Sequence, residues 1–204
     1  RKPMCRFIET IRVENGRAIS LPYHQKRVNE SLLLTGGRNI RLSLAGLLGN
    51  LPMAEGIFKA RIVYDNAGKV LEQSLSPYTP KKVRTLRLVD CDDIDYSLKY
   101  ADRTMLNALA ARAGGADEII IVRQGQLTDT SYSNIALYDG EQWFTPRNPL
   151  LRGTMRQRLL DDGLIQEADI APADLPRYSK AALINAMMPL GTSCTDTEFI
   201  AYEL

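Results

Sequence analysis

The sequence predicts an α+β chain folded in two lobes. Many short segments rich in β-branched and aromatic residues are interspersed with a few segments whose apolar residues recur at helical spacing, and the two kinds do not alternate strictly. A chain of 204 residues can bury a core without disulfides or metals. An acidic, irregular stretch near residue 90 divides it. We therefore expect a small N-terminal domain over 1–89, a linker over 90–96 and a larger C-terminal domain over 97–204.

The N-terminal domain is expected to open with a β-hairpin. Residues 7–13 are rich in apolar and β-branched side chains, and the turn dipeptide Asn15-Gly16 follows them, with a return strand over 18–21. Pro22 suits the first turn of a helix, which Gly36 would end. The remaining elements expected here are a helix over 42–51 and strands over 58–64, 70–78 and 85–89.

The C-terminal domain is expected to begin with a helix. Leu98, Met105, Leu106 and Leu109 recur at helical spacing within residues 97–113, and two glycines follow. The remaining elements expected here are a strand over 118–122, a hairpin over 134–138 and 142–145, a helix over 153–162 and a strand over 183–186.

Composition excludes several classes of function. The net charge is only +2, from 26 basic and 24 acidic residues, which argues against nucleic-acid binding. A single histidine, His24, excludes a multi-histidine metal site, and we expect no metal. The three cysteines are far apart and indicate reduced thiols in the cytoplasm. We expect no membrane span and, from residues 1–12, no signal peptide.

Two side chains could carry covalent or electrostatic chemistry. Lys99 lies near the start of the predicted helix, where the helix dipole disfavours an ammonium, and a neutral amine can form a Schiff base. Taken alone, Lys99 is better explained as a solvated lysine. Asp129 lies in the polar stretch 127–134 and could pair with a ring nitrogen of a cofactor. Taken alone, that stretch is better explained as a Ser/Thr-rich loop.

Two further places could hold a phosphate. Gly153, Thr154 and Met155 open a predicted helix, where unpaired N–H groups and a hydroxyl suit an anion, although Gly153 would equally suit a tight turn. Arg27 could bind a phosphate through two hydrogen bonds, although an exposed helix face is the simpler interpretation. We expect His24 to cap or pack rather than to act as a catalyst.

Taken together, these places occur in a recognisable order. The chain resembles the class IV aminotransferases, the fold-type IV (D-amino acid aminotransferase-like) enzymes that use pyridoxal phosphate, and it is most similar to their lyase branch, which acts on aminodeoxychorismate. The likeness covers nearly the whole chain. The segments that carry it are Phe7-Ile8-Glu9-Thr10-Ile11-Arg12-Val13-Glu14-Asn15-Gly16, His24-Gln25-Lys26-Arg27, Leu98-Lys99-Tyr100-Ala101-Asp102-Arg103, Ala116-Asp117-Glu118, Leu127 to Asn134, Thr145-Pro146-Arg147, Gly153-Thr154-Met155-Arg156-Gln157 and Ile184-Asn185-Ala186-Met187-Met188-Pro189-Leu190.

The resemblance implies roles for some of these residues. Lys99 would carry the cofactor as a Schiff base, Arg27 would bind its phosphate, and Asp129 would keep its pyridine nitrogen protonated, which makes the ring a better electron sink. The family folds in two lobes with the cofactor between them and forms homodimers. The other residues implied in cofactor binding are Ser133, Asn134, Gly153, Thr154, Met155 and Asn185.

The resemblance also implies a reaction on a small amino substrate. A lyase would convert 4-amino-4-deoxychorismate to 4-aminobenzoate, a folate precursor, and pyruvate. The alternatives are an amino-acid transaminase of the branched-chain or D-amino acid type and, less favoured because Lys99 is retained, a non-catalytic protein that binds a phosphorylated ligand.

The chain departs from the family pattern in three ways. Aspartate stands at 129 where the family usually has glutamate, Asp102 stands where it often has asparagine, and the linker is acidic. An acidic linker beside the pocket would repel a dianionic substrate. Arg12 or Arg103 could supply the missing positive charge.

Overall fold

The computed structural model describes residues 4–202, which form two compact units. The first unit comprises Arg1–Thr79 and Leu98–Asp102, and the second comprises Pro80–Ser97 and Arg103–Leu204. The predicted α+β class is confirmed. The division into domains at 89/90 and 96/97 stays a prediction, and the compact units divide the chain elsewhere. Residues 1–3 of the predicted N-terminal domain lie outside the described residues.

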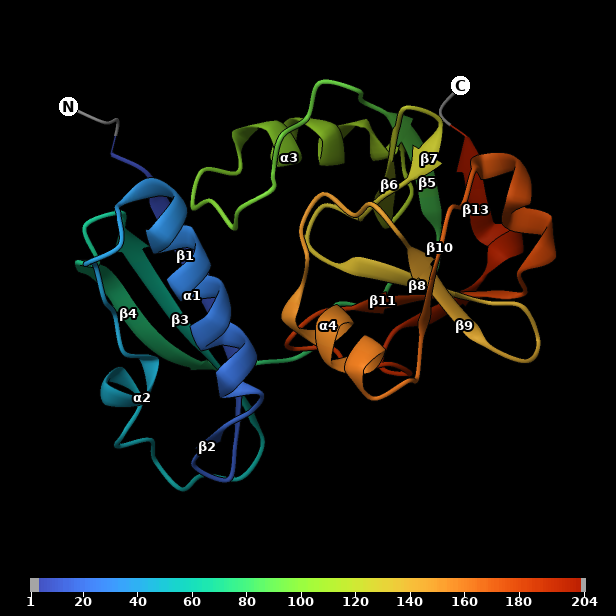
Figure 1. Cartoon of the computed structure of the whole chain (residues 1–204). Coiled ribbons are helices and arrows are strands. Elements are labelled where there is room, and N and C mark those ends of the chain that lie inside the picture. The colour runs from blue at the N-terminus through green and yellow to red at the C-terminus, as the bar shows by residue number, and fades with distance from the viewer. Residues whose placement is uncertain (1–3, 203–204) are drawn as a thin grey trace. The chain divides into compact units, whose positions relative to one another are not determined.

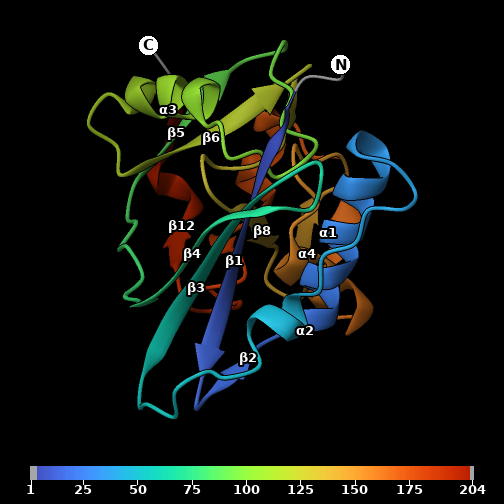
Figure 2. The same ribbon diagram turned by 90° about the vertical axis from the view of Figure 1, so that its left-hand side faces the viewer.

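The first unit is built on an antiparallel sheet with the strand order β2-β1-β3-β4. Figure 1 shows its strands and helices at the blue-to-teal end of the colour scale. The paired strands β1 and β3 also run side by side in Figure 2. The elements are β1 (Arg6–Glu14), β2 (Arg17–Ala18), α1 (Leu21–Thr35), α2 (Leu44–Leu47), β3 (Ile57–Asp65) and β4 (Val70–Pro77).

The predicted hairpin at the N-terminus is confirmed. Asn15 and Gly16 both have positive φ, 47° and 69°, as a two-residue hairpin turn of this kind requires. The return strand is shorter than expected, because α1 begins at Leu21. Odd-numbered residues of β1 are buried and even-numbered ones are at least partly exposed. One face of β1 therefore packs into a core that includes Val28 and Leu32 of α1.

The second unit contains two sheets. Their strand orders are β10-β9-β8-β11-β12 and β13-β5-β6-β7. Its strands are β5 (Leu86–Asp90), β6 (Glu118–Arg123), β7 (Gln126–Leu127), β8 (Asn134–Tyr138), β9 (Trp143–Pro146), β10 (Gln166–Ala168), β11 (Lys180–Ile184), β12 (Cys194–Asp196) and β13 (Ile200–Tyr202). Its helices are α3 (Thr104–Ala110), α4 (Thr154–Asp161) and the 3₁₀ turns η1 (Ala111–Ala113), η2 (Pro172–Arg177) and η3 (Thr197–Phe199).

The predicted helix over 97–113 is wrong at its start. The helix begins only at Thr104, and the residues before it lie along β1 instead. The N–H of Ile8 donates to the carbonyl of Lys99 at 3.0 Å, and the N–H of Ala101 donates to the carbonyl of Arg6 at 2.9 Å. Pairing with a strand overrides the helical pattern here, so the helix-dipole argument for a neutral Lys99 does not apply.

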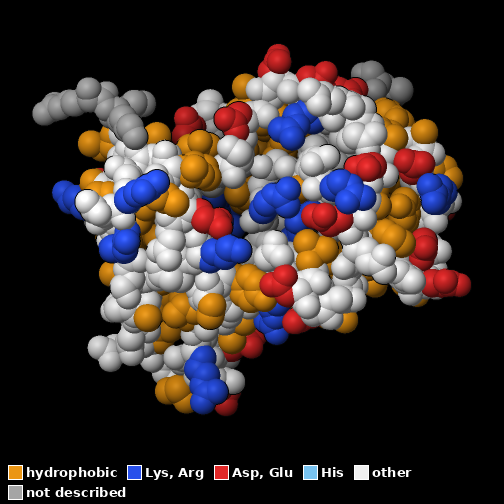
Figure 3. All heavy atoms as spheres, viewed as in Figure 1, with side chains coloured by type: hydrophobic (Ala, Val, Ile, Leu, Met, Phe, Trp, Pro, Cys, Tyr) orange, Lys and Arg blue, Asp and Glu red, His pale blue; other side chains and the backbone are white. Residues whose placement is uncertain are grey.

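The predicted helix over 42–51 is also shorter than expected. It covers only Leu44–Leu47, and the hydroxyl of Ser43 accepts a hydrogen bond from the N–H of Gly46 at its start. Within residues 4–202 none of the three cysteines forms a disulfide. Within the same range no helix combines the length and the apolar character that a membrane span requires. Figure 3 shows acidic and basic side chains both scattered over the viewed face.

Candidate functional site

A buried carboxylate organises the site residues of the first unit. Glu9 lies on the buried face of β1 and is 0% exposed. The Arg27 guanidinium donates to both of its oxygens, from Nε to Oε1 at 2.7 Å and from Nη2 to Oε2 at 2.6 Å. Nδ1 of His24 lies 2.6 Å from Oε2. The structure thus brings Arg27 together with two residues to which the sequence analysis gave no role in the site.

Electrostatics fix the charges of this cluster. Burial raises the pKa of Glu9, but the charge and hydrogen bonds of Arg27 and His24 outweigh burial and bring that pKa to about 2. Burial lowers the pKa of His24 and outweighs the hydrogen bond and the charge of Glu9, which raise it, while the positive charges of Arg27 and Lys99 lower it further. Glu9 is therefore ionised and His24 neutral at pH 7. Because the charge of Lys99 lowers the pKa of His24, Lys99 acts electrostatically on this cluster.

The acidic pKa of Glu9 predicts a loss of stability in acid. Its folded-state pKa lies below the ordinary value of 4.5, so its contribution is present above that value and is lost as the pH falls towards 2. The full contribution is about 3 kcal/mol, of which about 2 kcal/mol is lost between pH 5 and pH 3. We expect urea unfolding to show the advantage of the wild type over Glu9→Gln shrinking across this interval. Parallel pH curves for the two proteins would contradict the assignment.

The two arginines expected at the substrate each make hydrogen bonds within their own unit. Arg12 is on β1 but on the face opposite Glu9, since alternate residues of a strand point to opposite faces. Its Nε donates to Glu14 at 2.6 Å. Arg103 belongs to the second unit, where its Nη2 donates to the carbonyl of Ser131 at 2.7 Å, in the loop that carries Asp129. The role of both arginines in substrate binding stays a prediction.

Asp129 is a buried carboxylate of the second unit. Its Oδ1 accepts a hydrogen bond from Nδ2 of Asn134 at 2.8 Å, and its Oδ2 accepts one from the N–H of Leu151 at 2.9 Å. Burial raises the pKa of Asp129 to about 6, although these hydrogen bonds and the charge of Arg156 act in the opposite direction. At pH 7 the carboxylate is mostly ionised and held on both oxygens, which suits it to pair with a cationic ring nitrogen.

The neighbours of Asp129 hold its loop in place. Asn134 also donates to the carbonyl of Leu151 at 2.8 Å. The hydroxyl of Ser133 lies 2.7 Å from that of Thr130 and closes a tight turn. Asn185 donates to the carbonyl of Tyr132, while its Oδ1 accepts from two N–H groups of its own turn. The side chains of Asn134 and Asn185 therefore use these hydrogen bonds to hold the loop in its conformation.

The start of α4 adjoins this loop. Gly153 precedes the helix, and no side chain caps it. A β-carbon added at Gly153 would lie 2.1 Å from Oδ1 of Asn134. Thr154 is buried, and Met155 packs into the apolar cluster that contains Leu159. The structure thus brings Gly153 together with Asn134, whereas the side chain of Met155 belongs to the core.

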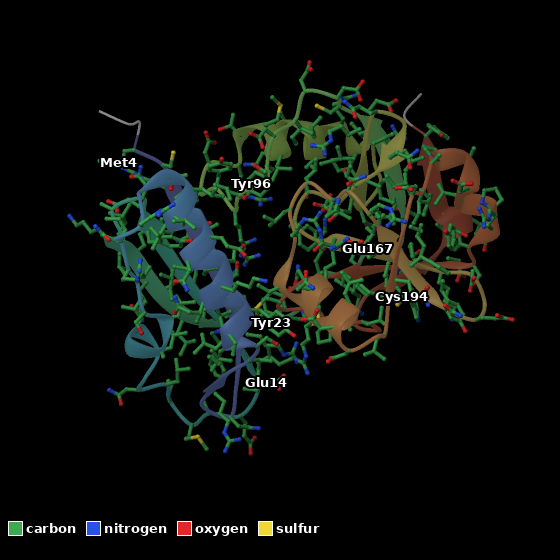
Figure 4. All side chains as sticks on the ribbon, viewed as in Figure 1. Met4, Glu14, Tyr23, Tyr96, Glu167 and Cys194 are labelled. Atoms are coloured by element: carbon green, nitrogen blue, oxygen red, sulfur yellow. The ribbon has the colours of Figure 1, made fainter. Side chains whose placement is uncertain are left out.

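Arg156 is a third residue whose role was not predicted from the sequence. It is 0% exposed, and its Nη2 donates to the carbonyl of Pro146 at 3.0 Å and to Glu167 on β10 at 2.6 Å. Figure 4 labels Glu167 among the side chains of this unit. Within residues 4–202, Nε and Nη1 of Arg156 have no hydrogen-bond partner. A sequence signal existed for Glu9, because a charged residue at an odd position of β1 interrupts the apolar face, but none distinguished Arg156 from a solvated helix residue.

Comparison with known proteins gives consistent findings. A family profile described as amino-transferase class IV matches residues 6–192. An uncharacterized protein of Haemophilus influenzae is 36% identical over 188 residues, which are 90% of this chain and 98% of that protein. The solved structure of a “putative 4-amino-4-deoxychorismate lyase” from Haemophilus somnus 129pt is 39% identical, with a TM-score of 0.82, and the match covers 91% of this chain and 98% of that one.

A more distant structure shares the fold alone. It is that of “a hypothetical aminotransferase from Mycobacterium tuberculosis, PLP-bound form”, with a TM-score of 0.69 and 19% identity. The match covers 96% of this chain and 81% of the other.

Proposed function

Because the chain belongs to the amino-transferase class IV family, whose enzymes depend on pyridoxal phosphate, we propose that it is a lyase that converts 4-amino-4-deoxychorismate to 4-aminobenzoate and pyruvate. The observation that carries the proposal is the match along nearly the whole length of both chains to the Haemophilus somnus protein of that name. The two products together contain every atom of the substrate, so the reaction needs no second substrate. The product would serve as a folate precursor.

The residues present fit pyridoxal phosphate by their chemistry. A primary amine (Lys99) and a guanidinium (Arg27) belong to the first unit, and a buried carboxylate (Asp129) and an uncapped helix start (Thr154) belong to the second. These match an aldehyde, a phosphate and a ring nitrogen. When bound, the cofactor supplies an electron-withdrawing ring joined to the substrate nitrogen.

Residues of this chain would hold the cofactor and transfer the proton. Lys99 would hold the cofactor covalently through Nζ until the substrate amine replaces it, and the released Nζ would then remove a proton from the carbon that bears the substrate nitrogen. Asp129 would stay ionised and keep the ring nitrogen protonated. Arg27 would hold the phosphate, so that the bound group does not move while the proton is transferred.

A pyruvate assay tests the reaction. Purified protein loaded with pyridoxal phosphate and given 4-amino-4-deoxychorismate should release pyruvate and 4-aminobenzoate in equal amounts with no keto acid added. No release of these two products, together with transfer of an amino group from an amino acid to an added keto acid, would overturn the lyase proposal in favour of a transaminase. The acidic stretch from Asp90 to Asp95 favours that second candidate, since it suits a dianionic substrate poorly. A protein that takes up no pyridoxal phosphate would overturn both.

The role of Asp129 predicts a split between two substitutions. Asp129→Asn should lower turnover about a hundredfold, because a neutral amide does not hold the ring nitrogen protonated. It should also cost about 1–3 kcal/mol of stability, since one of the two donors on the carboxylate would face the new NH₂ group. Asp129→Glu keeps the charge and should retain more activity. Steady-state kinetics and urea unfolding measure both effects, and equal activity in the two variants would remove Asp129 from this role.

The family resemblance further supports a homodimer in the cytoplasm as the working form. Sedimentation of the loaded protein should give about twice the chain mass of 22.8 kDa. A protein that sediments as a monomer while fully active would contradict the dimer.

A further inference from the structure

The Glu9 cluster is unusual for its place in the fold. Glu9 stands on a face of β1 that otherwise contributes Phe7, Ile11 and Val13 to the core. Burying a carboxylate costs free energy that apolar residues of similar volume would not, so a buried ion pair is weak evidence for a purely stabilising role. The carboxylate lies on the central part of β1, and both of its partners lie on α1, three residues apart on one helix face.

The hydrogen bonds fix the orientation of Arg27. Two parallel bonds from Nε and Nη2 to one carboxylate define the plane of the guanidinium, which a single bond would not do. The Arg27 side chain is 11% exposed, whereas that of Glu9 is 0% exposed. The pair of Glu9 and Arg27, which we call the clamp, therefore has a fully buried carboxylate and an arginine side chain that keeps a small exposed part.

His24 completes the clamp. It is neutral and 0% exposed, so its Nδ1–H donates to Glu9 Oε2, and within residues 4–202 its Nε2 has no hydrogen-bond partner. Leaving one nitrogen of a buried imidazole unpaired costs free energy. The presence of histidine here therefore indicates that the hydrogen bond of its other nitrogen has a function. Its bond reaches the same oxygen that accepts from Arg27 Nη2, which limits rotation of the Glu9 carboxylate.

We propose that Glu9, completed by His24, is a positioning residue that orients the Arg27 guanidinium towards the phosphate group of the cofactor. Glu9 then sets how strongly the protein prefers the phosphorylated aldehyde to pyridoxal itself. This inference rests on the proposed function only in that it requires pyridoxal phosphate to bind. It does not depend on which reaction follows.

The test is the binding preference of the cofactor-free protein. Dissociation constants for pyridoxal phosphate and for pyridoxal are measured by absorbance titration on the wild type, Glu9→Gln, Arg27→Ala and the double variant. In Glu9→Gln the constant for pyridoxal phosphate should rise at least about tenfold, while that for pyridoxal stays within about twofold. The double variant should match Arg27→Ala, because Glu9 acts through Arg27.

Two outcomes would overturn the inference. One is a folded Glu9→Gln protein that keeps the wild-type preference. The other is an equal weakening of both ligands, which a clamp that serves only the packing of α1 on β1 would produce. A wild-type protein that binds pyridoxal phosphate but releases no pyruvate would contradict the proposed lyase activity without affecting this inference.

A second pair of variants covers the case in which Glu9→Gln does not fold. Asparagine can place an N–H near the position of Nδ1 in histidine, and leucine cannot. His24→Asn should therefore retain most of the preference for the phosphorylated ligand, and His24→Leu should lose it. The same loss in both variants would overturn the role of the His24 bond.

Discussion

Lys99→Ala is expected to lower turnover by at least about a thousandfold, because no other group supplies the amine that binds the cofactor and then moves the proton. The fold should survive, since Lys99 pairs with β1 through its backbone carbonyl, which alanine retains. Pyruvate release measures the effect. Borohydride treatment of the loaded wild type should fix the cofactor to the peptide that contains Lys99, and the variant should give no such adduct.

Two further variants sharpen the result. Lys99→Arg keeps the positive charge but lacks a primary amine, so it should be as inactive as the alanine variant. Lys82→Ala removes an exposed lysine of the second unit and should leave turnover unchanged. An adduct on a different lysine, or substantial turnover in Lys99→Ala, would show that another residue holds the cofactor.

Gly153→Ala is expected to destabilise the protein by about 1–3 kcal/mol and to weaken cofactor binding. The added methyl would lie 2.1 Å from Oδ1 of Asn134, a short side chain that cannot move aside without losing its hydrogen bonds to Asp129 and Leu151. The backbone itself is not the cause, because φ at Gly153 is −67°, which alanine adopts readily. Urea unfolding and a pyridoxal phosphate titration measure the two effects.

Gly46→Ala is the matched control. Gly46 also has an ordinary backbone conformation, and a β-carbon there would meet nothing closer than 3.5 Å. It lies in α2, where alanine is the better helix former, so its stability should be unchanged or slightly higher. Equal stability of the two variants would show that the Asn134 side chain rearranges without cost.

Local patterns predicted the elements that depend on local physics. The turn at Asn15-Gly16, the proline at the start of α1 and the apolar, β-branched composition of β1 can each be recognised within a few residues, and the structure confirms each prediction. The segment around Lys99 could not be read in this way. Its helical spacing is real, but hydrogen bonds to a strand more than ninety residues earlier decide its conformation.

The candidate site shows the same limit. The sequence indicated Arg27 and Asp129 as ionisable groups, but not what holds them. The charge of Glu9 among the apolar residues of β1 was a signal in the sequence, but its partners were not, and Arg156 stood out only once the first turn of α4 was known to be buried. Partners that meet across elements leave little trace in a single sequence, because the distance that joins them is set by tertiary packing.

The five residues Leu98–Asp102 belong with the first unit, although the eighteen residues before them and all those after them belong with the second. Neither unit is therefore a continuous piece of chain. A gene fragment that ends before residue 98 would encode the four-stranded sheet yet leave the amide of Ile8 without the carbonyl to which it donates. Dissecting this protein into separately produced halves would call for a rearranged order of segments, and a ribosome completes the first half only after it has begun the second.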